Sequence, residues 1–231
     1  MKALAVITAR GGSKRIPGKN KKEFLGKPIL VYSIEAALQS NLFDEVMVST
    51  DDEEIAAIAM KAGAKVPFMR SAQNANDYAT TDEVLLEVLE EYEKRGQTFD
   101  YLVCLYPTAP FVTPEKLQKA LELLVENKAA GAMPVVDFSF PPQRGMSIGE
   151  DKKLRYCYPE NALKRSQDLE KMYHDCGQFY AYEVKRFRET KGNLEEGYLP
   201  IVVSELEVQD IDTLTDWKLA ELKYRLWKEQ I

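Results

Sequence analysis

Apolar residues along the chain form short continuous runs that alternate with longer stretches of helical periodicity. Residues 3–8 (ALAVIT) and 101–106 (YLVCLY) are uninterrupted runs rich in β-branched and other apolar side chains, which is typical of buried strands. Residues 82–96, in contrast, repeat their apolar positions every three or four residues, as an amphipathic helix does. This alternation predicts an α/β domain with a largely parallel central sheet and right-handed crossovers.

Turn and capping residues set the limits of the expected elements. We expect strands over residues 3–8, 45–50, 101–106, 129–138 and 177–184, with a weaker extended piece at 65–69 that contains Pro67. We expect helices over residues 28–39, 53–63, 82–96, 114–127 and 213–228. Residues favoured as helix N-caps stand at the starts of three of these helices: Asp51 or Asp52, Thr80 or Thr81, and Thr113.

The alternation breaks after about Phe138. Residues 139–170 show no helical period and contain several turn signals, and the segments RGMSIG and KLRYCY predict a hairpin that turns at GEDKK. We therefore expect one domain over residues 1–231, with residues 139–170 as an arm inserted within it. An extended hairpin leaves strand edges and apolar side chains exposed unless something covers them.

Composition narrows the class of protein. With 45% hydrophobic residues, a net charge of −6 and a pI near 5.1, the chain is suited to a globular fold and not to general nucleic-acid binding. Its three cysteines are widely spaced and include no CxxC pair, which favours a reducing compartment over a disulfide or zinc framework. The N-terminal apolar run is too short for a signal peptide, and nothing later resembles a membrane span. We expect a cytoplasmic protein with no nucleic-acid or membrane partner.

One loop departs from this acidic balance. Between Arg10 and Lys22 there are six lysines or arginines and no acid, directly after the strand at 3–8. Basic loops are commonly only solvated, but loops that follow parallel strands lie where ligands bind in α/β sheets. Glycines let backbone amides approach an anion, and arginine offers a planar fork for phosphate. The loop predicts a triphosphate cradle, although it matches neither the GxxxxGK[ST] nor the GxGxxG pattern.

A pair of acids near the C-terminus supplies a second candidate site. The segment VQDIDT places Asp210 and Asp212 two positions apart, so their carboxylates point to one side if the segment is extended. Two such carboxylates suit Mg²⁺, which is bound in proteins by one or two acids together with substrate phosphates. Asp212 also precedes the last expected helix and could serve as its N-cap.

Several motifs taken together resemble a known family. The loop ARGGSKRIPGKN, with STDDEEIA, PFMRS, ATTDEVL, LYPTAPF, RSQDLEKMYHDCGQFYAY and VQDID, resembles the CMP-sugar synthetases that activate nonulosonic acids. The resemblance implies a Rossmann-like nucleotidyltransferase fold and attack of the sugar's anomeric hydroxyl on the α-phosphate of CTP, with release of pyrophosphate. PTAPFVT, FSFPPQR and YHDCGQFY are most similar to the branch that takes pseudaminic acid. Tyr106 stands where the sialic acid branch typically carries glutamine.

The resemblance also implies roles for individual residues. Catalytic roles fall to Arg10, Lys19, Asp210 and Asp212, of which the two aspartates bind Mg²⁺. The residues expected to bind the nucleotide are Ala9, Arg10, Gly11, Gly12, Ser13, Lys14, Lys19, Asn20, Arg70, Thr80, Thr81 and Asp82, with Asn20 and Arg70 on the cytosine. The residues expected to bind the sugar are Arg165, Gln167, Tyr173, His174, Gln178 and Phe179.

In this family the arm crosses a two-fold axis and completes the partner's sugar pocket, which implies a homodimer for this chain. The CMP-sugar product implies a role in surface glycan or flagellin glycosylation. Alternative substrates are N-acetylneuraminic and legionaminic acids; the eight-carbon acid of lipopolysaccharide is disfavoured because its synthetases carry a different first motif. A nucleotide-binding protein without turnover is a further alternative, against which Lys19, Asp210 and Asp212 argue.

Overall fold

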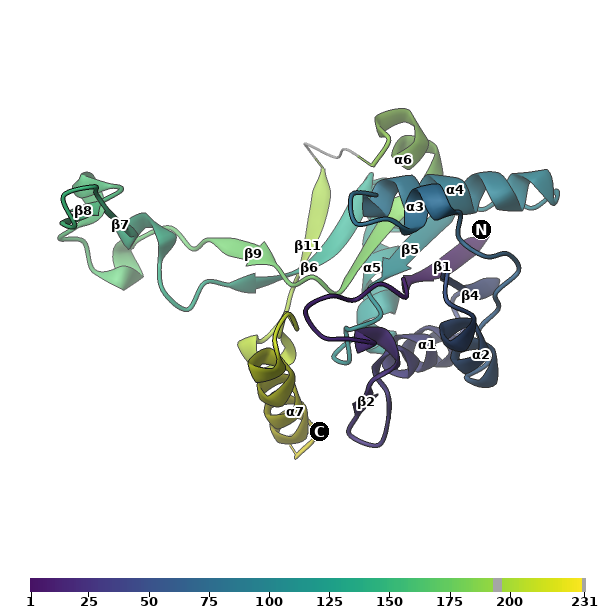
Figure 1. Cartoon of the computed structure of the whole chain (residues 1–231). Helices are drawn as coiled ribbons and strands as arrows, with labels where there is room; N and C mark the ends of the chain where they lie inside the picture. Colours follow the sequence, from purple (N-terminus) through teal and green to yellow (C-terminus); the bar gives the residue numbers. More distant parts are fainter. Residues whose placement is uncertain (193–196, 230–231) are drawn as a thin grey trace.

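The computed structural model describes residues 1–192 and 197–229, and its centre is a twisted sheet with helices on both faces (Figure 1). In this part of the chain seven strands form the sheet, in the order β11-β6-β10-β5-β1-β4, and β9 pairs with β6 beyond that path. The pairings β1–β4, β1–β5 and β11–β6 are parallel, whereas β10 runs antiparallel to both its neighbours. The predicted α/β fold with a mostly parallel sheet is confirmed.

The sheet strands are β1 (Ala3–Thr8), β4 (Glu45–Ser49), β5 (Tyr101–Leu105), β6 (Gly131–Asp137), β9 (Tyr173–Asp175), β10 (Phe179–Glu183) and β11 (Tyr198–Val202). The helices are α1 (Ile29–Ser40), α2 (Glu53–Lys61), α3 (Ala72–Ala75), α4 (Thr81–Lys94), α5 (Pro114–Asn127), α6 (Val184–Thr190) and α7 (Leu214–Glu229). Two further strand pairs are β2 (Glu23–Phe24) with β3 (Lys27–Pro28), and β7 (Met146–Ile148) with β8 (Leu154–Tyr156).

The core consists of two layers, one on each face of the sheet. Alternate side chains of β1 and β5, such as Ile7 and Leu105, pack with α1, α2 and α5 on one face. Leu4 and Leu102 point to the opposite face, where α4 and α6 cover them. Because both faces of these strands are buried, their sequences read as continuous apolar runs, which is why they were recognisable. A third cluster, centred on Trp217, fixes α7 against α1 and β2.

The helix caps follow the sequence signals closely. Thr80 and Glu83 form a capping box at the start of α4, and Asp52 accepts hydrogen bonds from the first turn of α2. Thr113 caps α5 directly before Pro114. Helix α1 begins one residue later than expected, because Pro28 is its N-cap and not its first residue.

The structure also contains α3, α6 and the β2–β3 pair, which the sequence pattern did not reveal, and it differs from the expectation at the edges of the sheet. Residues 65–69 form only an isolated bridge from Lys65 to Met47 and no strand. The sequence pattern did not reveal β9, whose three residues are exposed, or β11, whose Pro200 is tolerated at the sheet edge. β9 (YHD) has no apolar run, whereas β11 (YLPIV) is an apolar run that contains Pro200, a residue disfavoured within strands.

The expected hairpin is present as β7 and β8, which form a two-stranded sheet of their own. Together with the loops around it, the hairpin projects from the main body as an arm, and β9 leads the chain back to the sheet (Figure 1). No helix within residues 1–192 and 197–229 is long and apolar enough to cross a membrane.

Candidate active site

A cleft opens at the ends of β1 and β5, where the loops that follow these parallel strands meet. Its volume is about 370 Å³. The loop after β1, the start of α4 and the loop after β5 form its walls. The cleft is lined by Thr8, Arg10, Ser13, Lys14, Arg15, Ile16, Lys19, Asn20, Arg70, Asp77, Ala79, Thr80, Thr81, Val84, Tyr106, Pro107 and Thr108.

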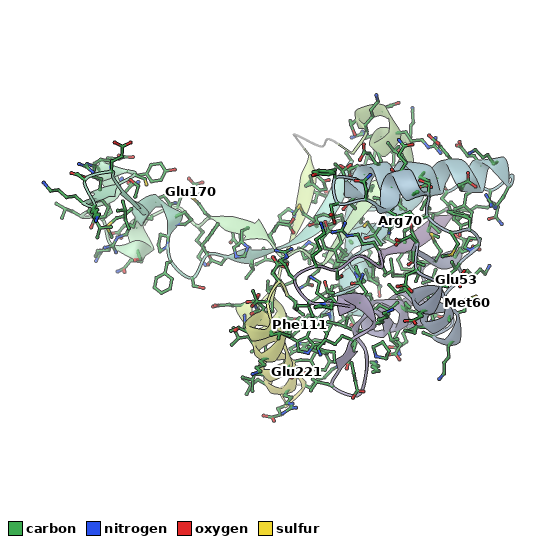
Figure 2. All side chains as sticks on the ribbon, in the orientation of Figure 1. Glu53, Met60, Arg70, Phe111, Glu170 and Glu221 are labelled. Carbon is green, nitrogen blue, oxygen red and sulfur yellow. The ribbon has the colours of Figure 1, made fainter. Side chains whose placement is uncertain are left out.

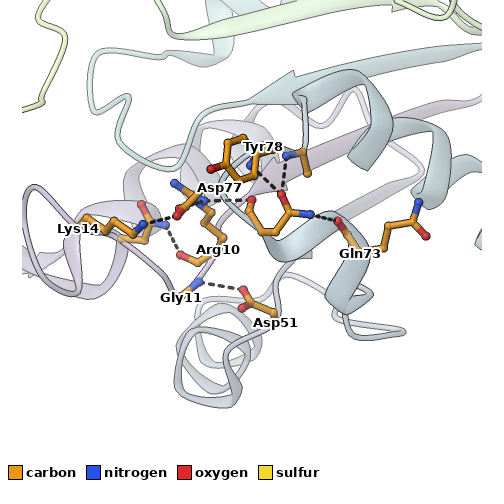
Figure 3. Close-up of polar contacts among 10 residues, drawn as sticks. Arg10, Gly11, Lys14, Asp51, Gln73, Asp77 and Tyr78 are labelled. Atoms are coloured by element: carbon orange, nitrogen blue, oxygen red, sulfur yellow. Dashed lines mark hydrogen bonds and ion pairs between the residues drawn. The ribbon is translucent and has the colours of Figure 1, made fainter.

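Two cations of the basic loop are paired with an acid from another segment, Asp77. Nη1 of Arg10 lies 2.8 Å from Oδ1 of Asp77 and donates to the backbone oxygen of Asn76 at 3.1 Å. Nζ of Lys14 binds the other carboxylate oxygen of Asp77 (Figure 3). These cations lower the pKa of the Asp77 carboxyl through hydrogen bonds from Lys14 and Arg10. An anionic ligand in the cleft therefore competes with Asp77 for both cations.

The glycine at position 11 allows the loop to approach the start of α2. The backbone amide of Gly11 donates to Oδ1 of Asp51 at 2.9 Å (Figure 3). A Cβ at Gly11 would lie only 2.9 Å from the Cβ of Asp52, so a larger residue would displace the loop. Ala9 is buried behind the cleft and Gly12 faces open space, and neither lines the cleft.

Two buried polar side chains reach the cleft from below the loop. Asn20 is 5% exposed, and its amide donates to the backbone oxygen of Arg10 at 2.8 Å. Arg70 is 8% exposed and donates to the hydroxyl and the backbone oxygen of Ser49 at 3.0 and 2.6 Å. Burial lowers the pKa of the Arg70 guanidinium, and the nearby Asp51 carboxylate partly offsets this effect. The cleft thus has a fixed cation and a fixed amide in its lining.

The segment that carries the two late aspartates lies against the basic loop although 192 positions separate Lys19 from Ile211. Nζ of Lys19 donates to the backbone oxygen of Ile211 at 2.6 Å and lies 3.7 Å from Oδ1 of Asp212. Arg15 binds the other oxygen of Asp212. Burial lowers the pKa of Lys19, while Asp212 and, more weakly, Asp210 oppose that shift. Lys19 therefore lies between the cleft, which it lines, and the acid pair.

The alternative interpretation of Asp212 as a helix cap is wrong. The hydroxyl of Thr213 accepts from the amide of Asp216 at 3.2 Å, and Asp216 in turn accepts from the amide of Thr213 at 2.7 Å. Thr213 is thus the cap of α7, and the Asp212 carboxylate faces Lys19 and Arg15 instead.

The acid pair fits an ion that takes few protein ligands. Within the part of the chain that the structure describes, no group of three or more histidine, cysteine or acidic side chains could hold a metal. Mg²⁺ does not need such a cage, since it keeps several waters and substrate oxygens around one or two carboxylates. Asp210 and Asp212 offer two carboxylates of that kind, and Asp212 lies against Arg15 and Lys19, which line the cleft.

The start of α4 and the loop after β5 meet at the opposite wall. The hydroxyls of Thr81 and Tyr106 lie 3.4 Å apart, and Thr80 also lines the cleft. Asp82 does not line the cleft; burial, with a smaller effect from Glu83, raises the pKa of its carboxyl.

The six residues predicted to bind sugar do not line this cleft in the single chain. Phe179 is fully buried in the core, and Gln178 donates to the backbone oxygen of Glu207 at 2.6 Å while its amide oxygen is buried without a partner among the described residues. Tyr173 and His174 belong to β9 at the base of the arm. The remaining two, Arg165 and Gln167, lie on the arm, where Arg165 pairs with Asp168. Figure 2 shows Glu170, close to them in sequence, on the arm and far from Arg70.

Sequence reasoning missed three contacts of the site. It assigned no role to Arg15, although this residue belongs to the basic loop and pairs with Asp212. It also assigned none to Asp77, because no sequence motif around this residue indicates that it pairs with Arg10. It also missed a link at the wall, where Tyr180 packs on Tyr106 and donates from its hydroxyl to Asp175 at 2.5 Å. Alternation along β10 placed the aromatic side chains of this strand on two faces but could not say which of them packs on the cleft residue Tyr106.

Comparison with known proteins decides the family. The Cytidylyltransferase family profile matches residues 4–190. The chain belongs to the cytidylyltransferase family. It is 41% identical to the pseudaminic acid cytidylyltransferase of Campylobacter jejuni serotype O:2, over 98% of this chain and 97% of that protein. It is 35% identical to the CMP-N,N'-diacetyllegionaminic acid synthase of Legionella pneumophila, over the full length of both.

The fold is also that of solved cytidylyltransferases. A structure of CMP:2-keto-3-deoxy-manno-octonic acid synthetase complexed with CTP superposes with a TM-score of 0.71, at 20% identity, over 99% of this chain and 100% of that one. This likeness confirms the expected nucleotidyltransferase fold.

The pairing of Asp77 with two cations of the cleft leads to a binding prediction. Asp77→Asn removes the competing carboxylate, so we expect tripolyphosphate to bind about three- to tenfold more tightly, in line with the modest strength of exposed ion pairs. Isothermal titration at low salt measures this change. Glu126→Gln, which removes an equal charge from the exposed end of α5, is the control and should bind as the wild type does. Unchanged affinity in Asp77→Asn would show that Asp77 does not compete with the anion.

Proposed function

We propose that this protein transfers a cytidylyl group from CTP to a nonulosonic acid, with pseudaminic acid as the substrate, to form the CMP-sugar and pyrophosphate. The observation that carries the proposal is the position of Lys19 between a cationic cleft of about 370 Å³ and the acid pair, where it lies 3.7 Å from the Asp212 carboxylate. The 41% identity to a pseudaminic acid cytidylyltransferase, over nearly the whole of both chains, supports this choice of sugar. We place the reaction in the cytoplasm and the product in surface glycan or flagellin glycosylation.

The cations supply the main electrostatic assistance. Arg10, Ser13 and Lys14 hold the triphosphate after Asp77 has given up its two partners. Lys19 neutralises charge that develops on the α-phosphate and the leaving pyrophosphate, because preorganised cations act most strongly on charge formed in the transition state. Positioning and neutralisation are the principal needs of such a transfer, since the protein forms no covalent bond.

Asp210 and Asp212 would hold Mg²⁺, which on binding supplies charge neutralisation and orients oxygen atoms of the substrates. Arg15 and Lys19, which line the cleft, hold the Asp212 carboxylate at its margin. The chain itself therefore prepares the acid pair for the ion by fixing one of the two carboxylates.

Base recognition falls to the two buried polar residues of the cleft. The guanidinium of Arg70 offers fixed donors to the carbonyl oxygen of cytosine, and the Asn20 amide can both donate and accept. Both side chains are held by backbone oxygens, of Ser49 and Arg10 respectively, so they do not reorient freely. Thr80 and Thr81 lie on the opposite wall, toward the nucleoside.

The arm completes the site of a second copy in this proposal. Its apolar side chains are unusually exposed for a single chain: Phe140 is 86% exposed, Ile148 73% and Leu163 99%. Arg165 and Gln167 lie on the same arm and not at their own cleft, which fits a role in the partner's sugar pocket. An arginine suits the sugar carboxylate through paired hydrogen bonds.

The proposed activity is tested by pyrophosphate release from CTP with pseudaminic, legionaminic and N-acetylneuraminic acids assayed side by side. We expect release with pseudaminic acid, far less with UTP in place of CTP, and none after addition of EDTA, because the acid pair then lacks its ion. Release with another sugar only would reassign the substrate. CTP binding with no release for any sugar would instead indicate a nucleotide-binding protein without turnover.

The role of Lys19 is tested by substitution. Lys19→Ala removes a preorganised cation, so we expect kcat to fall by ~100-fold or more. Steady-state rates with CTP and pseudaminic acid measure the loss. Lys22→Ala is a suitable control, because Lys22 is an exposed cation of the same loop that does not line the cleft. An unchanged kcat would remove Lys19 from the mechanism.

The exposed arm predicts a homodimer with shared sites. Light scattering at assay concentration should give twice the monomer mass, and Leu163→Glu should shift the protein toward monomer and lower its activity, because it places charge in an apolar interface. Lys152→Glu, at the exposed turn of the hairpin, serves as the control for added charge on the arm. A fully active wild-type monomer would contradict the shared-site proposal.

A further inference from the structure

One more ion pair, mostly buried, lies outside the set of residues assigned so far and lines a hollow separate from the cleft. Nζ of Lys116 lies 2.8 Å from Oε1 of Glu207, and the two side chains are only 11% and 20% exposed. The same ammonium donates to the backbone oxygen of Phe111 at 2.9 Å. Lys116 belongs to the first turn of α5, and Glu207 ends the short 3-10 turn Glu205–Glu207. The pair thus joins the loop after β5 to the segment that leads to the acid pair.

Lys116 occupies a position that is unfavourable for a cation. The N-terminal turn of a helix carries partial positive charge, which disfavours lysine there. Burial also lowers the pKa of Lys116, and Glu207 only partly offsets that effect. A buried ion pair is weak evidence of a contribution to stability, and local conflicts of this kind concentrate at functional positions. The contact therefore calls for an explanation beyond stability.

The segment on which the pair acts has no regular structure of its own. Residues 208–212 belong to no helix or strand, so hydrogen bonds from other elements determine where this segment lies. Long side chains reach its backbone oxygens from three elements: Gln178 binds Glu207 at 2.6 Å, Lys223 binds Val208 at 2.7 Å, and Lys19 binds Ile211 at 2.6 Å. Lys116 adds an ion pair with a side chain, the Glu207 carboxylate, at the start of this segment, as Lys19 does with Asp212 at its end.

We propose that Lys116 and Glu207 are positioning residues that hold Asp210 and Asp212 at the edge of the cleft. Glu207 is three residues before Asp210, so a shift at this anchor is transmitted directly to the carboxylates. Through Phe111, Lys116 also ties the anchor to the loop after β5, which carries cleft residues such as Tyr106. The pair thereby fixes the distance between the acid pair and the wall of the cleft. This inference rests on the proposed function, because it assigns a purpose to the acid pair as metal ligands.

The test measures metal binding separately from turnover. Mn²⁺ replaces Mg²⁺ and is titrated by electron paramagnetic resonance in the presence of CTP and in the absence of sugar. In Lys116→Met we expect the Kd for Mn²⁺ to rise about 10- to 100-fold, as is common when outer-shell partners of metal ligands are removed. CTP binding without metal should change by less than about threefold, since the cations of the cleft stay in place. Turnover should recover partly at high Mg²⁺.

Two further variants keep the result interpretable. Leu124→Ala removes a fully buried side chain from the same helix, at the end remote from Glu207, and should lower Tm without changing Mn²⁺ affinity. Lys116→Met/Glu207→Met replaces the pair with apolar side chains of similar length, which protects the fold if the single variant does not fold. The double variant should also bind Mn²⁺ more weakly, because the tether is lost.

The outcomes separate this inference from the proposed function. Wild-type affinity for Mn²⁺ in both variants of the pair would overturn the inference alone. A loss of Mn²⁺ affinity in Leu124→Ala equal to that in Lys116→Met would also overturn it, because general destabilisation would then explain both. A wild-type protein that binds no Mn²⁺ in the presence of CTP would overturn the metal role of the acid pair and the inference together.

Discussion

The attraction between the cations of one loop and acids from distant segments organises this protein. Six basic residues within a short loop repel one another, and the structure offsets that repulsion by bringing Asp77 to Arg10 and Lys14, and Asp212 to Arg15 and Lys19. The parallel sheet makes this arrangement possible, since the loops after β1 and β5 emerge at one edge. The same charges that stabilise the free loop are those that an anionic substrate needs.

The two acids differ in what ligand binding would do to them. Asp77 is exposed and occupies cations of the cleft itself, so a phosphate takes its place. Asp212 lies at the margin, where Lys19 and Arg15 orient it without filling the cleft. In our proposal one acid is thus a counter-ion that the substrate displaces, and the other is a carboxylate that binds the metal. This difference follows from position, because both are aspartates facing cations of the same loop.

The arm and the buried pair show two ways in which an irregular segment is positioned. Residues 204–212 follow β11 along the chain and pair with none of the described strands. Side chains from α5, α7 and the basic loop hold them in place. The arm has its own small hairpin, but its apolar side chains stay uncovered within one chain. In our proposal a second copy supplies that cover, and the sugar site is then shared between protomers.

The amino-acid sequence by itself determined the features that depend on neighbours along the chain. The buried strands β1 and β5, the caps at Asp52, Thr80 and Thr113, and the hairpin of the arm were all predictable, because apolar periodicity and capping are local. The basic loop and the acid pair were recognisable from composition and spacing, and eight of the twelve predicted nucleotide-binding residues line the cleft.

Only the tertiary structure decided which of these groups meet. It placed Asp77 on Arg10, joined Lys116 to Glu207 and made Thr213, not Asp212, the cap of α7. It also inserted β10 antiparallel between β5 and β6, and added β9, which has no apolar run, and β11, whose apolar run contains Pro200. The reason is physical: contacts between residues far apart in the chain depend on how the whole sheet is ordered, and no local pattern encodes that order.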